Sequence, residues 1–292
     1  MKANQRRFAV DEKEYPFKDH WFTRNGSTMH YVDEGSGPAV LMLHGNPTWS
    51  FLYRKVIKGL TGKCRAIAPD YPGFGLSDHP AGYGYTPAEH ADWVAALLDH
   101  LEIDRHILIV QDWGGPIGLS LAVRNPERLA GLVLCNTWCW APMTNALVFS
   151  FVMGGPLGPF LQMKKNVFAR FLVPAGIVAK ENKTSGILAA YLAPFPDPAS
   201  RKGTYVFPRE IRKSAEWLGE IEGKLPLIAQ KPIEMVWAMK DFAFGSESYV
   251  KRWLGHFPGA NLNRIENASH YLQEDCPEQI AVAVERLLAK IG

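Results

Sequence analysis

The chain has 292 residues, of which 47% are hydrophobic and 21% charged; these values are typical of a globular protein and exclude a disordered or fibrous chain. At this length we expect one α/β domain, or one domain with an insertion, whose core needs neither disulfides nor a metal for stability. The net charge of +3 comes without a cluster of Lys or Arg, which argues against nucleic acid as a partner, and the four scattered cysteines indicate free thiols rather than a disulfide framework or a zinc site.

The N-terminal segment, residues 1–17, carries acidic residues early and contains no apolar core segment. These features differ from those of a secretory signal peptide, whose central region is apolar. We therefore predict a cytoplasmic protein.

Short β-rich runs alternate with amphipathic helical patterns along most of the chain. The runs lie at residues 28–32, 39–44, 65–68, 107–111, 131–134, 233–238 and 261–265. Helical patterns cover residues 87–101, 114–123 and 278–291, and Thr86 is placed to cap the first of them ahead of Pro87. Continuous apolar strands between amphipathic helices predict a mostly parallel sheet that is covered on both faces.

The alternation stops between residues 138 and 225, where helical patterns at 165–172, 183–191 and 209–219 occur without a convincing strand. Residues 129–163 carry no charge, but prolines and glycines interrupt them, so we predict a buried strand leading into an apolar lid rather than a membrane span. A helical insertion of this kind covers the edge of the sheet where ligands bind. An apolar lid serves as a pocket wall or as an association surface, which leaves homo-oligomerisation open.

The strongest local motif is ILIVQDWGG, residues 107–115. An apolar strand ends at one acid and continues through two glycines into a helix, which is typical of a nucleophile elbow. Because the residue at the nucleophile position is Asp112, the pattern predicts attack on an sp³ carbon and an alkyl-enzyme ester that water must cleave. The alternative is that Asp112 only caps the helix that follows.

A second motif, LMLHGNPTWS at residues 41–50, is a buried strand that ends in a tight turn. A loop at this position of a hydrolase sheet supplies a backbone N–H to the oxyanion. The side-chain amide of Asn46 and the indole N–H of Trp113 add two neutral donors, which suit a halide leaving group. The alternative is that Asn46 serves only the turn, as Asn before Pro often does.

His270, in the segment RIENASHYLQEDCPEQI, follows a strand and precedes the last helix. Nucleophile, acid and then histidine near the C-terminus is the chain order of this class of hydrolase. Asp241, after the strand at 233–238, is the favoured acid; Glu274 and Asp275 are rivals on the far side of His270. At the other position where such an acid occurs the chain has Asn136, which cannot stabilise an imidazolium.

Taken together, these motifs resemble those of the haloalkane dehalogenases, a family of the α/β-hydrolase superfamily. The segments HGNPTWS, QDWGG, PFPDP, MKDFAF and SHYLQED occur in the family's order, and the similarity extends from about Tyr15 to the last helix. The resemblance implies an α/β-hydrolase fold, with a mostly parallel eight-stranded sheet flanked by helices and a helical cap inserted after the sixth strand. It divides the chain into a main domain, residues 1–137 and 226–292, and a cap domain, residues 138–225.

The resemblance also implies a role for each candidate residue. Asp112 is the nucleophile, His270 the base and Asp241 the acid that orients it, while Asn46 and Trp113 stabilise the halide. An Asp-His-Asp triad with an Asn–Trp pair is similar to the family's third subfamily. The implied substrate is a small apolar haloalkane, which yields an alcohol, halide and a proton without a metal or organic cofactor. The pocket liners that the resemblance suggests are Phe168, Phe207 and Pro208.

Two alternatives remain open. An epoxide hydrolase shares the Asp nucleophile and the His–Asp pair, and would use Tyr191 and Tyr205, the only tyrosines of the cap, to protonate the opening alkoxide. Against it stand Val110, where epoxide hydrolases commonly have Gly, and Asn46, an unusual residue at its position in those enzymes. A non-catalytic relative that binds an apolar ligand would not need the complete triad.

Overall fold

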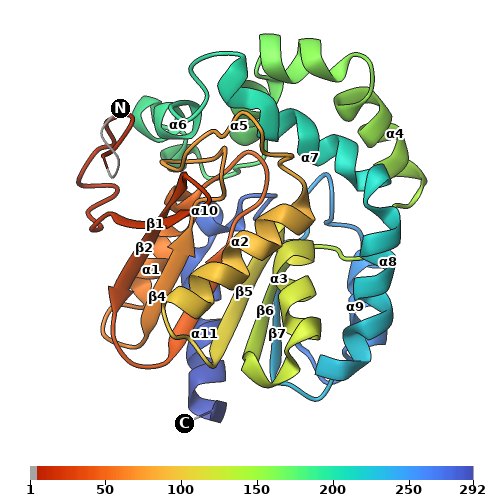
Figure 1. The fold of residues 1–292 in the computed structure, drawn as a ribbon. Helices are drawn as coiled ribbons and strands as arrows, with labels where there is room; N and C mark the ends of the chain where they lie inside the picture. Colours follow the sequence, from red (N-terminus) through yellow and green to blue (C-terminus); the bar gives the residue numbers. More distant parts are fainter. Residues whose placement is uncertain (1–4, 292) are drawn as a thin grey trace.

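A computed structural model describes residues 5–291, and its centre is an eight-stranded sheet (Figure 1). The strand order is β1-β2-β4-β3-β5-β6-β7-β8; β2 is antiparallel to both β1 and β4, and all other neighbours are parallel. The predicted sheet, mostly parallel and eight-stranded, is confirmed. The strands are β1 (His20–Arg24), β2 (Ser27–Gly35), β3 (Ala39–Leu43), β4 (Arg65–Pro69), β5 (His106–Asp112), β6 (Leu129–Thr137), β7 (Ile233–Ala238) and β8 (Asn261–Ile265).

Strand β1 is the strand that none of the predicted runs covers. Within residues 5–291 it is an edge strand whose one partner is β2, so its residues HWFTR are mostly half-buried and form no apolar run. The central strands β3 and β6, in contrast, are buried at every position. Burial on both faces is what makes a parallel strand recognisable as a continuous apolar segment.

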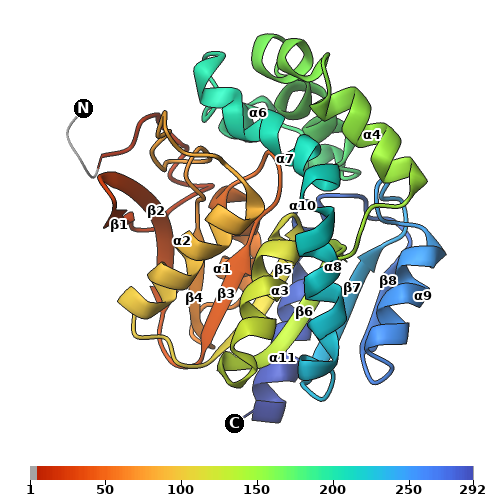
Figure 2. The same cartoon turned by 45° about the vertical axis from the view of Figure 1, so that its right-hand side comes forward.

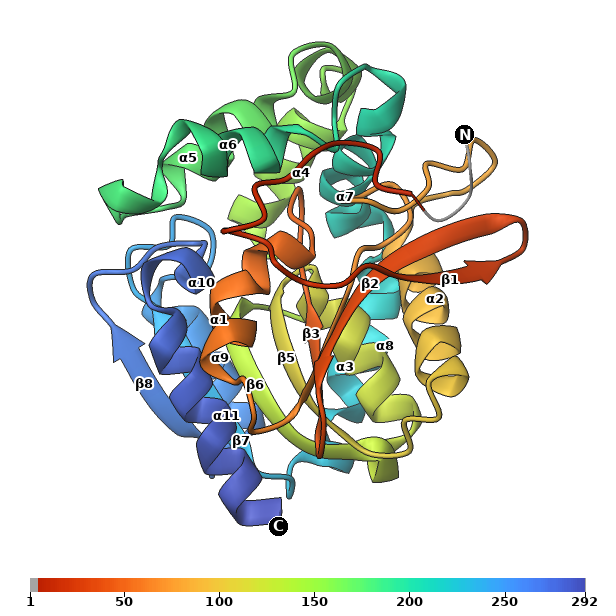
Figure 3. The same ribbon diagram turned by 90° about the vertical axis from the view of Figure 1, so that its left-hand side faces the viewer.

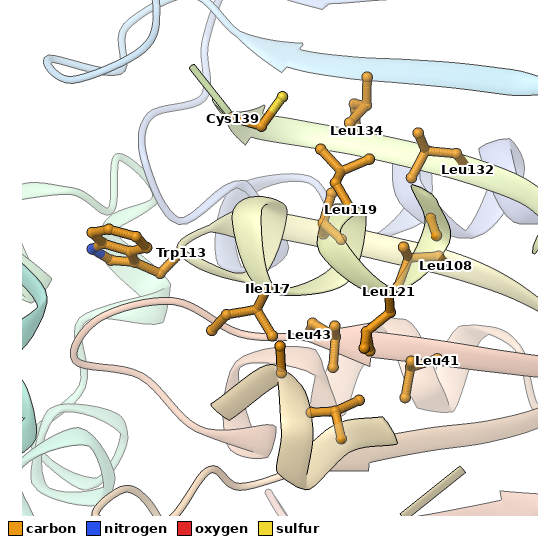
Figure 4. Close-up of a cluster of buried hydrophobic side chains, with 14 of the residues drawn as sticks. Leu41, Leu43, Leu108, Trp113, Ile117, Leu119, Leu121, Leu132, Leu134 and Cys139 are labelled. Carbon is orange, nitrogen blue, oxygen red and sulfur yellow. The ribbon is translucent and has the colours of Figure 1, made fainter. Parts of the chain in front are cut away.

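Helices cover both faces of the sheet (Figures 1 and 3). Because successive strand side chains point to opposite faces, Leu41 and Leu43 belong to one core and Val40 and Met42 to the other. Figure 4 shows the first core, where leucines of β3, β5 and β6 meet the apolar side chains of α3. The helices on that face are α2 (Pro87–His100), α3 (Gly114–Arg124), α8 (Ala215–Lys224) and α9 (Glu247–His256); α1 (Arg54–Gly59) and α11 (Pro277–Ile291) cover the other.

Helix α2 begins where the sequence predicted. Thr86 accepts a hydrogen bond from the backbone N–H of Glu89, and the Glu89 carboxylate accepts one from the backbone N–H of Thr86. This reciprocal capping box satisfies two N–H groups that the first helical turn leaves without partners.

The helical insertion lies above the carboxyl ends of the parallel strands (Figures 1 and 2). The helix predicted at 209–219 is two helices, because Ser214 leaves the helical conformation and its hydroxyl donates to Glu210. Helix α8, at the end of the predicted cap, packs against α3 in the layer of helices that covers the sheet. The division into a main and a cap domain stays a prediction. The insertion contains α4 (Thr144–Gly154), two π-helical segments (Pro159–Lys164 and Phe168–Leu172), α5 (Val173–Ala175), α6 (Ser185–Leu192), α7 (Lys202–Lys213) and α8.

The charge-free stretch at 129–163 is a strand followed by a cap helix, as predicted. All nine residues of β6 are buried, whereas Val148 and Phe151 of α4 are 59% and 60% exposed. Across residues 5–291, no helix has both the length and the apolar character that crossing a bilayer requires.

Candidate active site

The site begins at the sharp turn between β5 and α3. Asp112 has a φ of +49°, in the left-handed region that residues other than glycine rarely adopt. A Cβ on Gly114, two residues on, would lie 2.0 Å from the carbonyl oxygen of Leu43, so the chain needs glycine to start α3 beside β3. This is the geometry of a nucleophile elbow, and it lifts the Asp112 side chain above the middle of the sheet.

Backbone donors hold the carboxylate of Asp112. The N–H of Asn46 donates to Oδ1 at 2.8 Å, and the backbone N–H of Trp113 also favours the ionised form of this carboxyl group by lowering its pKa. A Cβ on Gly45 would lie 2.3 Å from Oδ1, so glycine is required for the loop after β3 to come this close. Burial raises the pKa of Asp112, while His270 and the two N–H groups oppose the rise. The carboxylate is therefore poorly solvated, which favours its reaction as a nucleophile.

His270, after β8, lies between two carboxylates. Its Nδ1 is 3.0 Å from Oδ2 of Asp241, which follows β7, and its Nε2 is 3.9 Å from Oδ2 of Asp112. The other oxygen of Asp241 accepts from the N–H of Ala243 at 2.7 Å, which fixes the carboxylate. Burial lowers the pKa of His270, but the charges of Asp241 and Asp112 outweigh it, so the net direction is upward.

The two acidic rivals of Asp241 make other contacts. Glu274 forms a buried ion pair with Arg54 and accepts a hydrogen bond from the Tyr191 hydroxyl at 2.6 Å. Asp275 accepts from the backbone N–H of Ser269 and from two consecutive N–H groups of the cap. Both acids therefore connect the cap and the segment around His270, while the partner of the His270 ring is Asp241.

Asn136 is a clamp between two strands. Its Oδ1 accepts from the backbone N–H of Ala238 at 2.7 Å, and its Nδ2 donates to the carbonyl of the same residue at 2.9 Å. Both ends of the amide are thus engaged in holding β6 beside β7.

The site residues border a cavity of about 610 Å³ between the sheet and the cap. The five predicted site residues all line it: Asn46, Asp112, Trp113, Asp241 and His270. Phe168 and Pro208 also line it, but Phe207 does not, because its ring is fully buried and stacks on Trp113 at 5.2 Å between ring centroids. Other apolar walls come from Trp138, Trp140, Met143, Ala146, Phe149, Leu172, Ile211, Phe242, Phe244, Tyr249 and Tyr271.

Trp138 and Trp140 are wall residues that the sequence reasoning missed. They belong to the segment WCW directly after β6, where the chain crosses the edge of the sheet that binds ligands. Trp138 meets Trp113 edge to face, with 4.8 Å between ring centroids. The sequence pattern that could have predicted them is a pair of aromatic residues immediately after a central parallel strand.

Asn46, on the loop after β3, and Trp113, at the start of α3, both line the cavity next to Asp112. The Oδ1 atom of Asn46 is buried and, within residues 5–291, accepts no hydrogen bond. The part of this amide that is able to face the cavity is therefore its NH₂ group. Among the described residues that line the cavity there is no Lys or Arg, so an anion formed there would meet neutral donors.

Neither of the two cap tyrosines is available to an epoxide in this cavity. The hydroxyl of Tyr191 is engaged by Glu274, and Tyr205 packs against Gly158, outside the cavity lining. In the described part of the lining, the tyrosines are Tyr249 and Tyr271, and both lie after the helical insertion in the chain.

Comparison with known proteins gives a consistent family. A family profile described as the alpha/beta hydrolase fold matches residues 38–277. Haloalkane dehalogenase 2 of Mycobacterium tuberculosis is 41% identical over 279 residues, which cover 95% of this chain and 97% of the relative. A cis-3-alkyl-4-alkyloxetan-2-one decarboxylase of Shewanella oneidensis is 35% identical over 286 residues, covering 94% and 89%. The crystal structure of a putative ancestral haloalkane dehalogenase superposes with a TM-score of 0.85 at 31% identity, covering 93% of this chain and 99% of that one.

Proposed function

The chain belongs to the haloalkane dehalogenases of the α/β-hydrolase fold, and from this premise we propose that it cleaves carbon–halogen bonds through a covalent ester on Asp112. The observation that carries the proposal is the position of this carboxylate. It lies at a strained elbow at the base of an apolar cavity, with His270 3.9 Å behind one oxygen and Asp241 behind His270.

In the first step, an oxygen of Asp112 attacks the carbon that bears the halogen. The new C–O bond forms as the carbon–halogen bond breaks, and the bonding electrons leave with the halide. The amide NH₂ of Asn46 and the indole N–H of Trp113 stabilise the halide as its charge develops. Because these donors are neutral, they hold the anion without the strong attraction of a Lys or Arg, which favours its later release.

In the second step, water hydrolyses the ester. Neutral His270 takes a proton from the water through Nε2 while the hydroxide attacks the carboxyl carbon of Asp112. The backbone N–H groups of Asn46, which holds the carboxylate, and of Trp113 stabilise the oxyanion, and Asp241 stabilises the imidazolium. The bond between the carboxyl carbon and the alkoxide oxygen then breaks, and the alkoxide takes the proton of the added hydroxyl group and leaves as the alcohol. Asp112 is regenerated as a carboxylate, and the proton on His270 passes to solvent.

We assign the chain to the third subfamily, with an Asp-His-Asp triad and an Asn–Trp halide pair. The other arrangements use a Glu at the position of Asn136 or a tryptophan from the cap. Asn136 is occupied between two strands, and the sequence contains no Trp between residues 141 and 216. Asp241 is therefore the acid of the triad, and Asn46 is the second halide donor beside Trp113.

The Shewanella relative favours a second candidate activity, the decarboxylation of a cis-3,4-dialkyl β-lactone. Such a substrate carries two alkyl chains, and a cavity of about 610 Å³ with apolar walls is of the size that holds a ligand larger than a short haloalkane. The two activities differ in their products, since the lactone reaction releases carbon dioxide and an alkene and no halide.

The test is to measure halide and proton release from a panel of bromoalkanes, beside alkene formation from a β-lactone and diol formation from an epoxide. Halide release that Asp112→Ala abolishes and the exposed control Asp104→Ala retains is the expected result. Alkene formation alone moves the assignment to the decarboxylase, and diol formation alone moves it to an epoxide hydrolase.

A further inference from the structure

One buried polar side chain beside His270 has no part in the reaction described above. Gln111 is the residue before Asp112 on β5 and is fully buried. Its Nε2 lies 3.1 Å from Nε2 of the His270 ring and 3.1 Å from the carbonyl oxygen of the same residue. The side chain therefore contacts the atom that must accept the proton of the hydrolytic water.

We propose that Gln111 is a positioning residue that holds His270 in the neutral Nδ1–H tautomer, with an unprotonated Nε2 beside the ester. The proposal rests on the proposed function, in which that nitrogen is the base. Gln111 contacts Nε2 of the ring and Asp241 contacts Nδ1, so the two residues act on opposite ends of His270.

The backbone of His270 fixes which end of the amide faces the ring. A carbonyl oxygen only accepts hydrogen bonds, so it requires the NH₂ group of Gln111 at this place. With the amide reversed, two oxygens would face each other at the same short separation. A peptide carbonyl does not titrate, so this orientation persists across the pH range.

This orientation leaves the oxygen at the other end of the Gln111 amide without a hydrogen bond among the described residues. The Oε1 atom of Gln111 is buried and has no hydrogen-bond partner within residues 5–291. A buried acceptor without a partner destabilises the fold, because it has lost its hydrogen bonds to water. A glutamine kept in such a position, where leucine would have a similar shape, indicates a role for its donor group rather than for its packing.

Both ends of the His270 ring then select one tautomer. The carboxylate of Asp241 accepts hydrogen bonds and so favours a proton on Nδ1, while the NH₂ of Gln111 donates and disfavours one on Nε2. The opposite tautomer would place an N–H against an NH₂ group and a lone pair against a carboxylate.

Gln111 also destabilises the imidazolium form of His270, in which both ring nitrogens carry a proton. The titratable groups that face His270 are Asp241 after β7, Asp112 at the end of β5, and Tyr271, the next residue in the chain after His270. Burial raises the pKa of Tyr271 and keeps this residue neutral. Burial lowers the pKa of His270, and the two carboxylates raise it more strongly. The NH₂ group of Gln111 acts against this rise, because an imidazolium would turn a second N–H toward it.

The test compares Gln111→Leu, which removes the donor, with Gln111→Glu, which replaces it with an acceptor. The matched control is Gln162→Leu, since Gln162 is also fully buried with an Oε1 that lacks a partner, but lies in the cap outside the cavity lining. Halide burst and ester hydrolysis are followed separately against pH with a bromoalkane.

For Gln111→Leu we expect a burst rate within about threefold of wild type and ester hydrolysis at neutral pH slower by about tenfold, the effect of one lost hydrogen bond. The acid limb of hydrolysis should move to higher pH, and further for Gln111→Glu, whose carboxylate stabilises the imidazolium. Equal losses in burst and hydrolysis with an unmoved acid limb, or behaviour like that of Gln162→Leu, would overturn the proposal.

A second measurement needs no substrate. The ¹⁵N spectrum of the histidine side chains in the wild-type protein should show His270, identified by the signal lost in His270→Gln, as the Nδ1–H tautomer above its pKa. An Nε2–H tautomer would overturn the role of Gln111. Absence of halide release by the wild type would instead overturn the proposed function, so the two failures are distinct.

Discussion

Replacing Asp241 with asparagine should abolish the hydrolytic half of the reaction and leave the first half intact. One oxygen of Asp241 accepts from the N–H of Ala243 at 2.7 Å, and an asparagine would keep this bond with its amide oxygen. Its NH₂ group would then face Nδ1 of His270, which must accept and so moves the ring proton to Nε2. In that tautomer His270 is no longer a base toward water, and its N–H faces the NH₂ of Gln111.

The size of the effect follows from the distance between the charges. Oδ2 of Asp241 lies 3.0 Å from Nδ1 of His270, so the centres of the two charged groups are separated by about 4 Å. At an effective dielectric constant of about 20, this attraction stabilises the imidazolium by about 4 kcal/mol. Its loss slows ester hydrolysis by about 10³-fold, to which the inverted tautomer adds.

Rapid-quench kinetics with a bromoalkane separate the two steps. Asp241→Asn should release one equivalent of bromide at close to the normal rate and then stall, with no matching alcohol. A variant that still unfolds at the wild-type temperature but hydrolyses its ester less than about tenfold more slowly would refute the reasoning. Loss of the bromide burst in that folded variant would refute it as well.

Three further results are expected. Burial lowers the pKa of His270, but the charges of Asp241 and Asp112 raise it more, and alkylation removes the charge of Asp112. The acid limb of single-turnover ester hydrolysis should therefore lie at lower pH than the His270 pKa that NMR measures in the free enzyme. Equal values would contradict this. Asn46→Ala should weaken halide binding about 10–100-fold, as fits a lost hydrogen bond to an ion, and unchanged halide quenching of tryptophan fluorescence would remove Asn46 from the site. Glu274→Gln removes the fully buried carboxylate that pairs with Arg54 and leaves this guanidinium, within residues 5–291, only the more exposed Glu14 as an ionic partner, which destabilises the fold by about 3–5 kcal/mol. The melting temperature should then fall by roughly 6–20 °C, and a fall under about 3 °C would contradict it.

The sequence predicted the parts of the fold whose signal is local. Strands buried on both faces are continuous apolar runs, and β5 through Gly114 combines such a run with an acid and glycines that only a tight turn requires. The edge strand β1 has one neighbour and is mostly half-buried, so its residues carry no comparable pattern.

Chain order predicted the nucleophile and the histidine of the site. Chain order alone did not decide which acid contacts the histidine or which side chains face the cavity, because packing determines both. Asp241 and its rivals Glu274 and Asp275 are equally acidic in sequence, and only the folded loops bring Asp241 to the ring of His270. Within the cap, the direction of a side chain depends on how α7 rotates against the sheet, and that rotation turns Phe207 onto Trp113 rather than into the cavity. The contact between Gln111 and His270 joins residues 159 positions apart, which no local pattern reveals.

The most direct measurement is the intact mass of His270→Ala after reaction with one bromoalkane, followed by peptide mapping. Alkylation needs no base, so the variant should release one equivalent of bromide and gain the mass of one alkyl group on the peptide that contains Asp112. Sustained turnover by this variant, or bromide release without an adduct on that peptide, would contradict a covalent ester on Asp112 that His270 hydrolyses.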